Sequence, residues 1–491
     1  MGALTPLPTL GVGVVCIPKL EPLIEAAADL IDVIEVEPQT LWRRAPGADE
    51  RYSVDGIRLD RIKRLPGRKI LHGVGFPIGS IRPPSRAQLP PLREMIDALA
   101  PPWMSEHLAF NRAVHDGRIL ETGFFLPPRQ TPSGVDAAVA SIRSVASELP
   151  IPFAIENGPS YLAPRADEMP DGAFVAEIAE RADCGLVLDL HNAWANHRNG
   201  RQPIGAFLAQ IPLDRVWEIH FAGGMDYRGY WLDAHCGDIA EEVIDVARDL
   251  IPDLANLKAL IFELTSSFVD RVDHSTVRRA LERLRALWER RRAASAPSMP
   301  FARAGEARRD DARPTPREWE DTLGALAVGR VVEGRLARDI AADPGLDIYR
   351  HLVGEFRAST MIGVLPFSGR LLLITLGPER LEQLLAEFWR QSPPEAFGSR
   401  EAQRFADYVA KLDLDVPLLA ELLTYDVAVV GALTENTSQS VRFRHDPRPI
   451  LSALADHRAP PLDVEADHAA EVTPDGITFY ALETRTVEMI E

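Results

Sequence analysis

Nine histidine and carboxylate residues stand at, or just after, the ends of short apolar runs in the first half of the chain. Six runs end in such a residue, and a loop after the fifth run adds two more. Histidine and carboxylate without thiolate is the ligand set of iron, manganese or zinc in a reactive centre. The nine are His72, His107, Glu156, Asp189, His191, His220 and Glu263 at the run ends, and Asp233 and His235 in the loop WLDAHCGD.

The number of these residues exceeds what one metal ion needs. A site of two histidines and one carboxylate would use only three of them. Buried charges that share one rim must be neutralised by opposite charge or by a metal. The surplus therefore predicts two or three ions, with hydrogen bonds that orient the ligands as the competing use of the extra residues.

Strands that end on a common rim must position these side chains. The six runs and two earlier ones, 11–17 and 32–38, give eight candidate strands. Helical apolar patterns separate most of them, which is typical of a parallel sheet covered on both faces. We predict a (β/α)8 TIM barrel, whose catalytic sites lie at the carboxyl ends of the strands. An open doubly wound sheet is the alternative. Helices are expected at 21–31, 89–100, 134–149, 172–183, 204–211, 239–251 and 275–294.

Residues beside the strand ends suggest how the site is completed. In DLHN, alternation along an extended segment would place Asp189 and His191 on the same side. We predict catalytic roles for these two residues and substrate binding by Asn157 and Asn192. The loop carrying Asp233 and His235 could close over the metals. For Glu35 and Glu37, on the second strand, we favour a structural role, and His115 and His197 are expected at the surface.

The totals exclude several classes of protein. A chain of 491 residues predicts two or three domains, and a net charge of −18 argues against nucleic-acid binding and against anionic membranes. No apolar run reaches the roughly 18 residues of a spanning helix, and the amino terminus does not read as a signal peptide. Three cysteines without CxxC spacing predict no disulfide framework. We expect a cytoplasmic protein with no membrane partner.

Composition divides the chain into two domains. Residues 1–293 hold the barrel pattern, and 294–317 are rich in Ala, Pro, Ser and Arg without periodicity, which is typical of a linker. Residues 318–491 have apolar patterning of their own and predict a smaller α+β domain. Within it, helices are expected at 380–392, 400–412 and 416–430, and strands at 440–446 and 476–483.

The motifs over about residues 9–270 resemble the multinuclear non-haem iron-dependent oxidative enzymes, the MbnB-like family. They are HGVG, SEHLAF, IENGPSYL, LVLDLHNAWANHRN, EIHFAGG, DAHCGD and FELTSS, in that order. The resemblance implies a TIM barrel that binds two or three irons at the strand ends. Many members have Asn where His191 stands, which leaves open whether His191 is an added ligand or orients one. The implied ligands are His72, His107, Glu156, Asp189, His220, Asp233, His235 and Glu263.

The resemblance also implies a substrate and a reaction. Such enzymes are oxidants of ribosomally made peptides that use Fe(II)/Fe(III) and O2 to remove hydrogen from the β-carbon of a core cysteine. Residues 318–491 resemble their partner proteins, so we expect a fusion of an oxidoreductase with a domain that presents the precursor peptide. Two other hypotheses stay open. One is a divalent-metal hydrolase or isomerase on a barrel like those of endonuclease IV and xylose isomerase, and the other is a binding module with purely structural metals.

Overall fold

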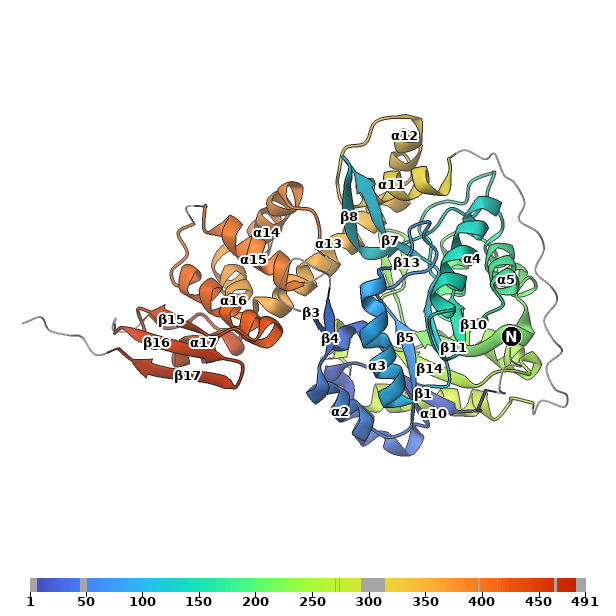
Figure 1. The fold of residues 1–491 in the computed structure, drawn as a ribbon, viewed down its shortest axis with the longest axis horizontal. Coiled ribbons are helices and arrows are strands. Elements are labelled where there is room, and N and C mark those ends of the chain that lie inside the picture. The colour runs from blue at the N-terminus through green and yellow to red at the C-terminus, as the bar shows by residue number, and fades with distance from the viewer. Residues whose placement is uncertain are drawn as a thin grey trace, which may run out of the picture.

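Eight parallel strands close into a barrel, as the sequence predicts, and the open-sheet alternative is wrong (Figure 1). The computed structural model describes residues 7–44, 51–269, 271–272, 274–292, 314–395, 398–412, 414–462 and 466–482. Around the barrel, each strand pairs in parallel with the next, and the last pairs with the first. In chain order the strands are β1 (Gly11–Cys16), β2 (Val33–Val36), β5 (Arg68–Gly73), β6 (Met104–His107), β9 (Phe153–Glu156), β10 (Gly185–Asp189), β11 (Val216–Ala222) and β14 (Ala259–Glu263).

Burial explains why these short runs become barrel strands. Every residue of β1, β2, β9, β10, β11 and β14 is buried, because helices cover the outside of the barrel and side chains fill its inside. The seven predicted barrel helices correspond to helices of the structure, with ends shifted by a few residues. The helices are α1 (Glu21–Ala26), α2 (Gly56–Arg64), α3 (Leu89–Leu99), α4 (Pro132–Ala146), α5 (Asp171–Ala182), α6 (Leu190–Arg198), α7 (Ile204–Leu208), α8 (Glu241–Leu250), α9 (Ser266–Val269) and α10 (His274–Trp288).

Three antiparallel hairpins interrupt the strand and helix alternation. The largest follows β6, the fourth barrel strand, and the third lies between β11 and the loop that carries Asp233. These hairpins bring chain over the end of the barrel where the predicted ligands lie. They are β3 (Trp42–Arg44) with β4 (Tyr52–Val54), β7 (Phe110–His115) with β8 (Arg118–Leu126), and β12 (Met225–Tyr227) with β13 (Tyr230–Leu232).

The C-terminal region forms a lobe beside the barrel (Figure 1). Its core, between residues 361 and 472, is built from C-terminal side chains alone. Helix α14 is broken at Gly377, where φ is 75°, just before Pro378. The elements are α11 (Pro316–Ala327), α12 (Arg335–Ala341), α13 (Gly345–Val364), α14 (Pro366–Gln391), α15 (Gly398–Val409), α16 (Leu419–Glu435), α17 (Pro447–Ala455), and the antiparallel strands β15 (Gln439–Phe443), β16 (His468–Thr473) and β17 (Gly476–Ala481).

The first helices of this region pack on the barrel. Trp319 and Leu323 of α11 share a hydrophobic cluster with Phe110 and Leu126 of the β7–β8 hairpin. Glu320 accepts hydrogen bonds from the Ser80 hydroxyl at 2.8 Å and from neighbouring groups of the same barrel loop. The chain after the predicted linker is therefore attached to the barrel before it enters the lobe.

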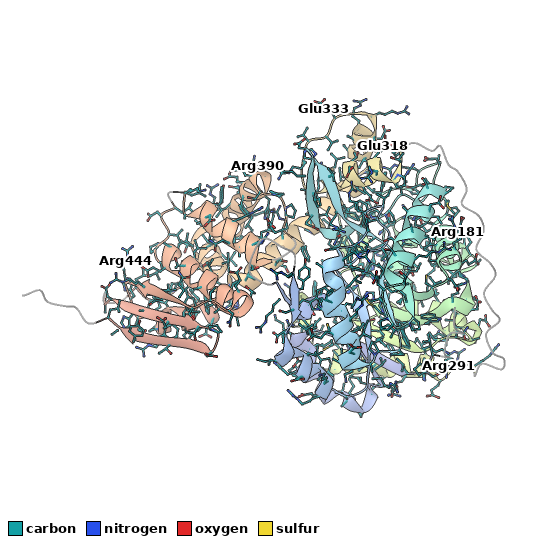
Figure 2. The ribbon with its side chains drawn as sticks, viewed as in Figure 1. Arg181, Arg291, Glu318, Glu333, Arg390 and Arg444 are labelled. Carbon is teal, nitrogen blue, oxygen red and sulfur yellow. The ribbon has the colours of Figure 1, made fainter. Side chains whose placement is uncertain are left out.

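The predicted domain boundaries stay a prediction. Most of the linker, 294–313, lies outside the described residues. Helix α11 begins at Pro316, and the Thr315 hydroxyl and Glu318 carboxylate cap it reciprocally. Among the described residues no single helix has the length and apolar character of a membrane span, and α13 with α14 passes such a test only as a pair bent by 114°. Figure 2 shows charged side chains such as Arg181, Arg291, Arg390 and Arg444 at the periphery of the molecule.

Candidate metal centre

Six of the predicted ligands meet at the carboxyl ends of six strands. Glu156, Asp189, His220 and Glu263 each offer an atom within 4.8 Å of the others, and so do His72, His107 and Glu156. Glu156 therefore belongs to both groups and lies between them. Except for His107, which is half-buried, these residues are at most 4% exposed.

In two of the histidines, one ring nitrogen contacts a polar group outside the cluster, and the other ring nitrogen faces the cluster. In His107, Nδ1 is 2.9 Å from the Gly73 carbonyl, which can only accept a hydrogen bond, and Nε2 is 3.2 Å from Glu156 Oε2. In His72, Nδ1 is 2.9 Å from the Ser105 hydroxyl and Nε2 is 3.0 Å from the same Glu156 oxygen. A partner on the far nitrogen fixes the tautomer of a metal-binding histidine and leaves the near nitrogen free for the metal.

His220 has its ring turned the other way. Its Nε2 lies 3.1 Å from Glu35 Oε2, and its Nδ1 faces Glu263 at 3.4 Å and Glu156 at 3.6 Å. Glu35 was expected to have a structural role, and here it is fully buried as the partner of a predicted ligand. In the sequence, a carboxylate in the middle of a buried strand indicates that Glu35 needs a polar partner. The closed barrel identifies this partner as His220.

Asp233 and His235 approach the cluster from the loop after β13. His235 Nε2 is 3.0 Å from Asp233 Oδ1 and 3.7 Å from Glu263 Oε2. The backbone of His235 is left-handed, with φ 47°, an uncommon conformation for a residue with a side chain. The loop thus turns sharply to bring both side chains next to the group that contains Glu263.

His191 does not lie on an extended segment, so the predicted alternation with Asp189 is wrong. Asp189 ends β10 and caps α6, because its Oδ1 accepts the Asn192 N–H at 2.6 Å. His191 is therefore in the first turn of a helix. Its Nε2 accepts a hydrogen bond from the Trp231 indole at 2.9 Å, and its Nδ1 is 3.0 Å from Asp233 Oδ1.

The two predicted substrate-binding amides hold the backbone of the site. Asn157 Oδ1 accepts the Asp189 N–H at 3.0 Å, and Asn157 Nδ2 donates to the Asp189 carbonyl at 3.0 Å. Asn192 Nδ2 donates to the Asn157 carbonyl at 3.3 Å, while its buried Oδ1 has no hydrogen-bond partner. Both amides line the cavity described below, so substrate binding by Asn157 and Asn192 stays a prediction.

Many of the side-chain oxygen and nitrogen atoms that point into the cluster have no hydrogen-bond partner. Among the described residues, most buried side-chain atoms without a partner lie here, although such atoms are rare in proteins. Carboxylate oxygens and imidazole nitrogens that point at one another without hydrogen bonds fit metal ions as their common partner. They are Glu35 Oε1, Glu156 Oε2, Asp189 Oδ2, His191 Nδ1, Glu218 Oε1, His220 Nδ1, Asp233 Oδ1 and Glu263 Oε2.

The pKa values describe a cluster with excess negative charge. Burial alone would lower the pKa of the His72 imidazole, but the charges of Glu35 and Glu156 raise this pKa to about 10. Burial, and then the charge of Glu156, raise the pKa of the Asp189 carboxyl well above its ordinary value. Even with imidazolium neighbours, one carboxyl is thus driven toward its neutral form. Bound cations would relieve this repulsion, so the charge balance also fits a metal centre.

A cavity of about 290 Å³ opens onto the cluster. One end is lined by His72, His107, Glu156, Asp233, His235 and Glu263. Much of the remaining lining is apolar. The Phe125 ring lies 4.4 Å from the His107 ring, and Tyr349 reaches the cavity from α13. The apolar part of the wall comprises Phe124, Phe125, Leu126, Pro127, Pro128, Phe174, Val175 and Phe207.

Known proteins resemble the barrel half of the chain. A UPF0276 protein of Anaeromyxobacter sp. is 34% identical over 46% of this chain and 80% of its own length. A UPF0276 protein of Streptomyces avermitilis is 28% identical over 51% of this chain and 50% of its own length. A xylose isomerase-like TIM barrel protein from Mycobacterium smegmatis, solved with magnesium, covers 59% of this chain and 100% of its own at 12% identity and a TM-score of 0.36.

Residues 13–271 match a family described as RiPP precursor modification enzyme MbnB/TglH/ChrH, where RiPP denotes a ribosomally made and later modified peptide. The chain therefore belongs to this family of peptide-modifying TIM-barrel enzymes.

Proposed function

We propose that this protein is a multinuclear iron enzyme that uses O2 to oxidise cysteine residues of a ribosomally made precursor peptide. The observation that carries the proposal is the pair of ligand groups that share Glu156. One carboxylate between two sets of ligands is suited to bridging two ions. The bound iron would supply a centre that holds the substrate thiolate and passes its electrons to O2.

Each ligand group would bind its own ion. His72, His107 and Glu156 would hold one ion, and Glu156, Asp189, His220 and Glu263 a second. His235 lies beside Glu263 and Asp233 lies beside His235, so these two residues would either complete the second site or hold a third ion. His191 would orient Asp233, because its other nitrogen is already used by Trp231.

The cavity supports a peptide substrate with an apolar residue beside the cysteine. Beside the ligand residues, its lining includes many aromatic, proline and aliphatic side chains. Such a wall would exclude water from the reacting cysteine and bind a neighbouring apolar side chain. Enclosure near the cluster would also keep the reactive carbon in one orientation.

The C-terminal lobe would present the precursor peptide. Strand β17 is an edge of the three-stranded sheet among the described residues, and Ile477 and Tyr480 on it are more than a third exposed. An open edge can pair with an extended peptide, so we propose that it takes the leader part of the precursor. A lobe that holds the leader would raise the local concentration of the core cysteine at the cavity.

The proposal is tested by co-expression with candidate precursors. Short cysteine-containing peptides encoded beside the gene would be produced with the full chain and analysed by mass spectrometry. We expect a mass change that requires O2 and disappears when the core cysteine is replaced by serine. His107→Ala should abolish the change, whereas His115→Ala, a partly exposed histidine in the β7–β8 hairpin, should not. A mass change that persists without O2, or with serine in place of cysteine, would contradict the proposal.

A further inference from the structure

Two tyrosines connect helix α13 to the loop that carries Asp233. Tyr349 of α13 is 1% exposed, and Tyr161, in the segment after β9, is 2% exposed. The Tyr349 hydroxyl accepts the Tyr161 N–H at 3.2 Å, and the Tyr161 hydroxyl accepts the Asp233 N–H at 3.1 Å. Two consecutive contacts thus lead from the C-terminal region to a predicted metal ligand.

The start of α13 is fitted closely to the segment that holds Tyr161. A Cβ on Gly345 would lie only 2.1 Å from the Tyr161 carbonyl oxygen, so a residue with a side chain could not sit there without a shift. Asp343 Oδ2 accepts the Ala163 N–H at 3.0 Å, and the rings of Tyr161 and Tyr349 meet edge to face at 5.3 Å. Any displacement of the start of α13 would therefore displace Tyr161.

The other end of α13 belongs to the C-terminal lobe. Arg357 and Glu401 form an ion pair at 2.6 Å in which both side chains are at most 4% exposed. Met361 lies in the core of the lobe. A helix of 20 residues is about 30 Å long, so α13 reaches from the lobe core to the cavity wall as one rigid element.

The Asp233 loop depends on Tyr161 at one particular point. The barrel itself anchors the far side of the loop, since the His235 carbonyl accepts the Thr265 N–H and the Cys236 N–H donates to Gly223, both at 3.0 Å. For the Asp233 N–H, the acceptor is the Tyr161 hydroxyl. Loss of this hydroxyl would thus free Asp233 more than His235.

We propose that Tyr161 and Tyr349 are positioning residues that hold Asp233 for metal binding, and that α13 thereby makes the metal centre depend on the C-terminal lobe. This inference rests on the metal-binding part of the proposed function. Residues that orient metal ligands typically change metal affinity by about 10-fold to 100-fold when they are replaced. The ion that uses Asp233 should be the one affected.

The test measures metal binding by the full chain after chelator treatment, with Fe(II) under anaerobic conditions and with Co(II) as a spectroscopic probe. Tyr161→Phe should weaken the most weakly bound ion by about 10-fold or more and change the Co(II) absorption of that site, while tighter ions bind as in the wild type. Tyr349→Phe should weaken the same ion. Because Tyr349 acts through Tyr161, the double variant should bind no more weakly than Tyr161→Phe alone.

Tyr230→Phe is the matched control. Tyr230 also packs against Tyr161, at a ring distance of 6.4 Å, but its hydroxyl does not bond the Asp233 loop in the described structure. Unchanged binding in both test variants, equal loss in Tyr230→Phe, or additive losses in the double variant would each overturn the inference. A wild-type chain that binds none of these ions would overturn the proposed function as well, so the two failures are distinguishable.

Discussion

The side-chain amide of Asn157 pairs with both backbone polar groups of Asp189. The two hydrogen bonds are each 3.0 Å long and are buried at the end of β10. They resemble the two hydrogen bonds that a residue pair exchanges in an antiparallel sheet, and they fix the backbone where the strand turns into helix α6. Asp189 can therefore cap the helix with one carboxylate oxygen while the other, Oδ2, faces the cluster.

This relationship predicts the effect of Asn157→Ala. Each buried backbone group left unpaired costs about 1–3 kcal/mol, so the free energy of unfolding should fall by at least that amount, and metal content should fall with it. Urea unfolding and metal analysis measure the two effects. Asn256→Ala is the control, because its amide donates to the Asp214 carbonyl at 2.7 Å at an exposed position. There we expect a change within about 0.5 kcal/mol and full metal content.

Because Glu156 belongs to two ligand groups, we expect its replacement to remove more metal than the replacement of a residue that belongs to one group. Expression with added iron should give at least two ions per chain, and a single zinc without iron would contradict this expectation. His107→Ala removes a member of one ligand group, so it should cost one ion, whereas Glu156→Ala should cost two. Metal analysis gives the ratio, and far-ultraviolet circular dichroism should show the same helical signal in both variants because the barrel core is untouched. Equal losses would mean that Glu156 does not bridge.

Replacement of His191 decides its role. Trp231 occupies its Nε2 and its Nδ1 lies 3.0 Å from Asp233 Oδ1, where it would orient that ligand, so His191→Asn should keep the full number of ions and lose only affinity. Asp189→Ala should lose an ion outright. Trp231 fluorescence should also change in His191→Asn, since the indole loses its acceptor. If His191→Asn loses a whole ion, as His107→Ala does, His191 is a ligand and the positioning role is wrong.

The sequence predicted the barrel better than the details of its rim. Strand ends could be predicted because an apolar run that stops at a histidine or carboxylate must both cross the core and end at a polar edge. His191 was misplaced because an aspartate that caps a helix competes with extended alternation, and the local sequence fits both. Tyr349 could not be assigned to the cavity, since its contact with Tyr161 spans 188 residues and depends on how α13 docks.

A buried carboxyl in the lobe predicts a dependence of stability on pH. Burial raises the pKa of Asp426, on α16, from 3.8 to about 6, even though Ser368 of α14 donates two hydrogen bonds to it. A raised folded-state pKa means that the stabilising contribution is present below pH 3.8 and is lost as the pH rises through about 6. The full effect is roughly 3 kcal/mol.

Asp426→Asn isolates this contribution from those of other titrating groups. The difference in unfolding free energy between variant and wild type should change by roughly 2.5 kcal/mol between pH 4 and pH 8, with the wild type losing more stability as the pH rises. Urea unfolding followed by circular dichroism at both pH values measures it. A difference that is the same at both pH values would show that the pKa of Asp426 is not raised in the folded lobe.

Because α11 packs on the barrel, we expect the two fragments of a cut chain to stay associated. Trp319 is 1% exposed, donates from Nε1 to the Pro127 carbonyl at 2.9 Å, and has the guanidinium groups of Arg129 and Arg165 over its ring at 5.0 and 4.7 Å. A protease site placed within 296–310 would divide the chain where the sequence predicts the linker. The two fragments should then elute together in size-exclusion chromatography, because α11 to α13 bury apolar side chains against the barrel.

Trp319→Ala should weaken this association. Truncation of a fully buried tryptophan costs about 3–5 kcal/mol, so the cut variant should separate at concentrations where the cut wild type does not. The cavity wall should also be disturbed, because Pro127 lines it and is held by the Trp319 indole. Ile57→Ala, at a side chain that is 75% exposed on α2, provides a control that should leave the fragments together. Fragments of the cut wild type that separate freely and each retain their fold would instead favour two independent domains joined only by the linker.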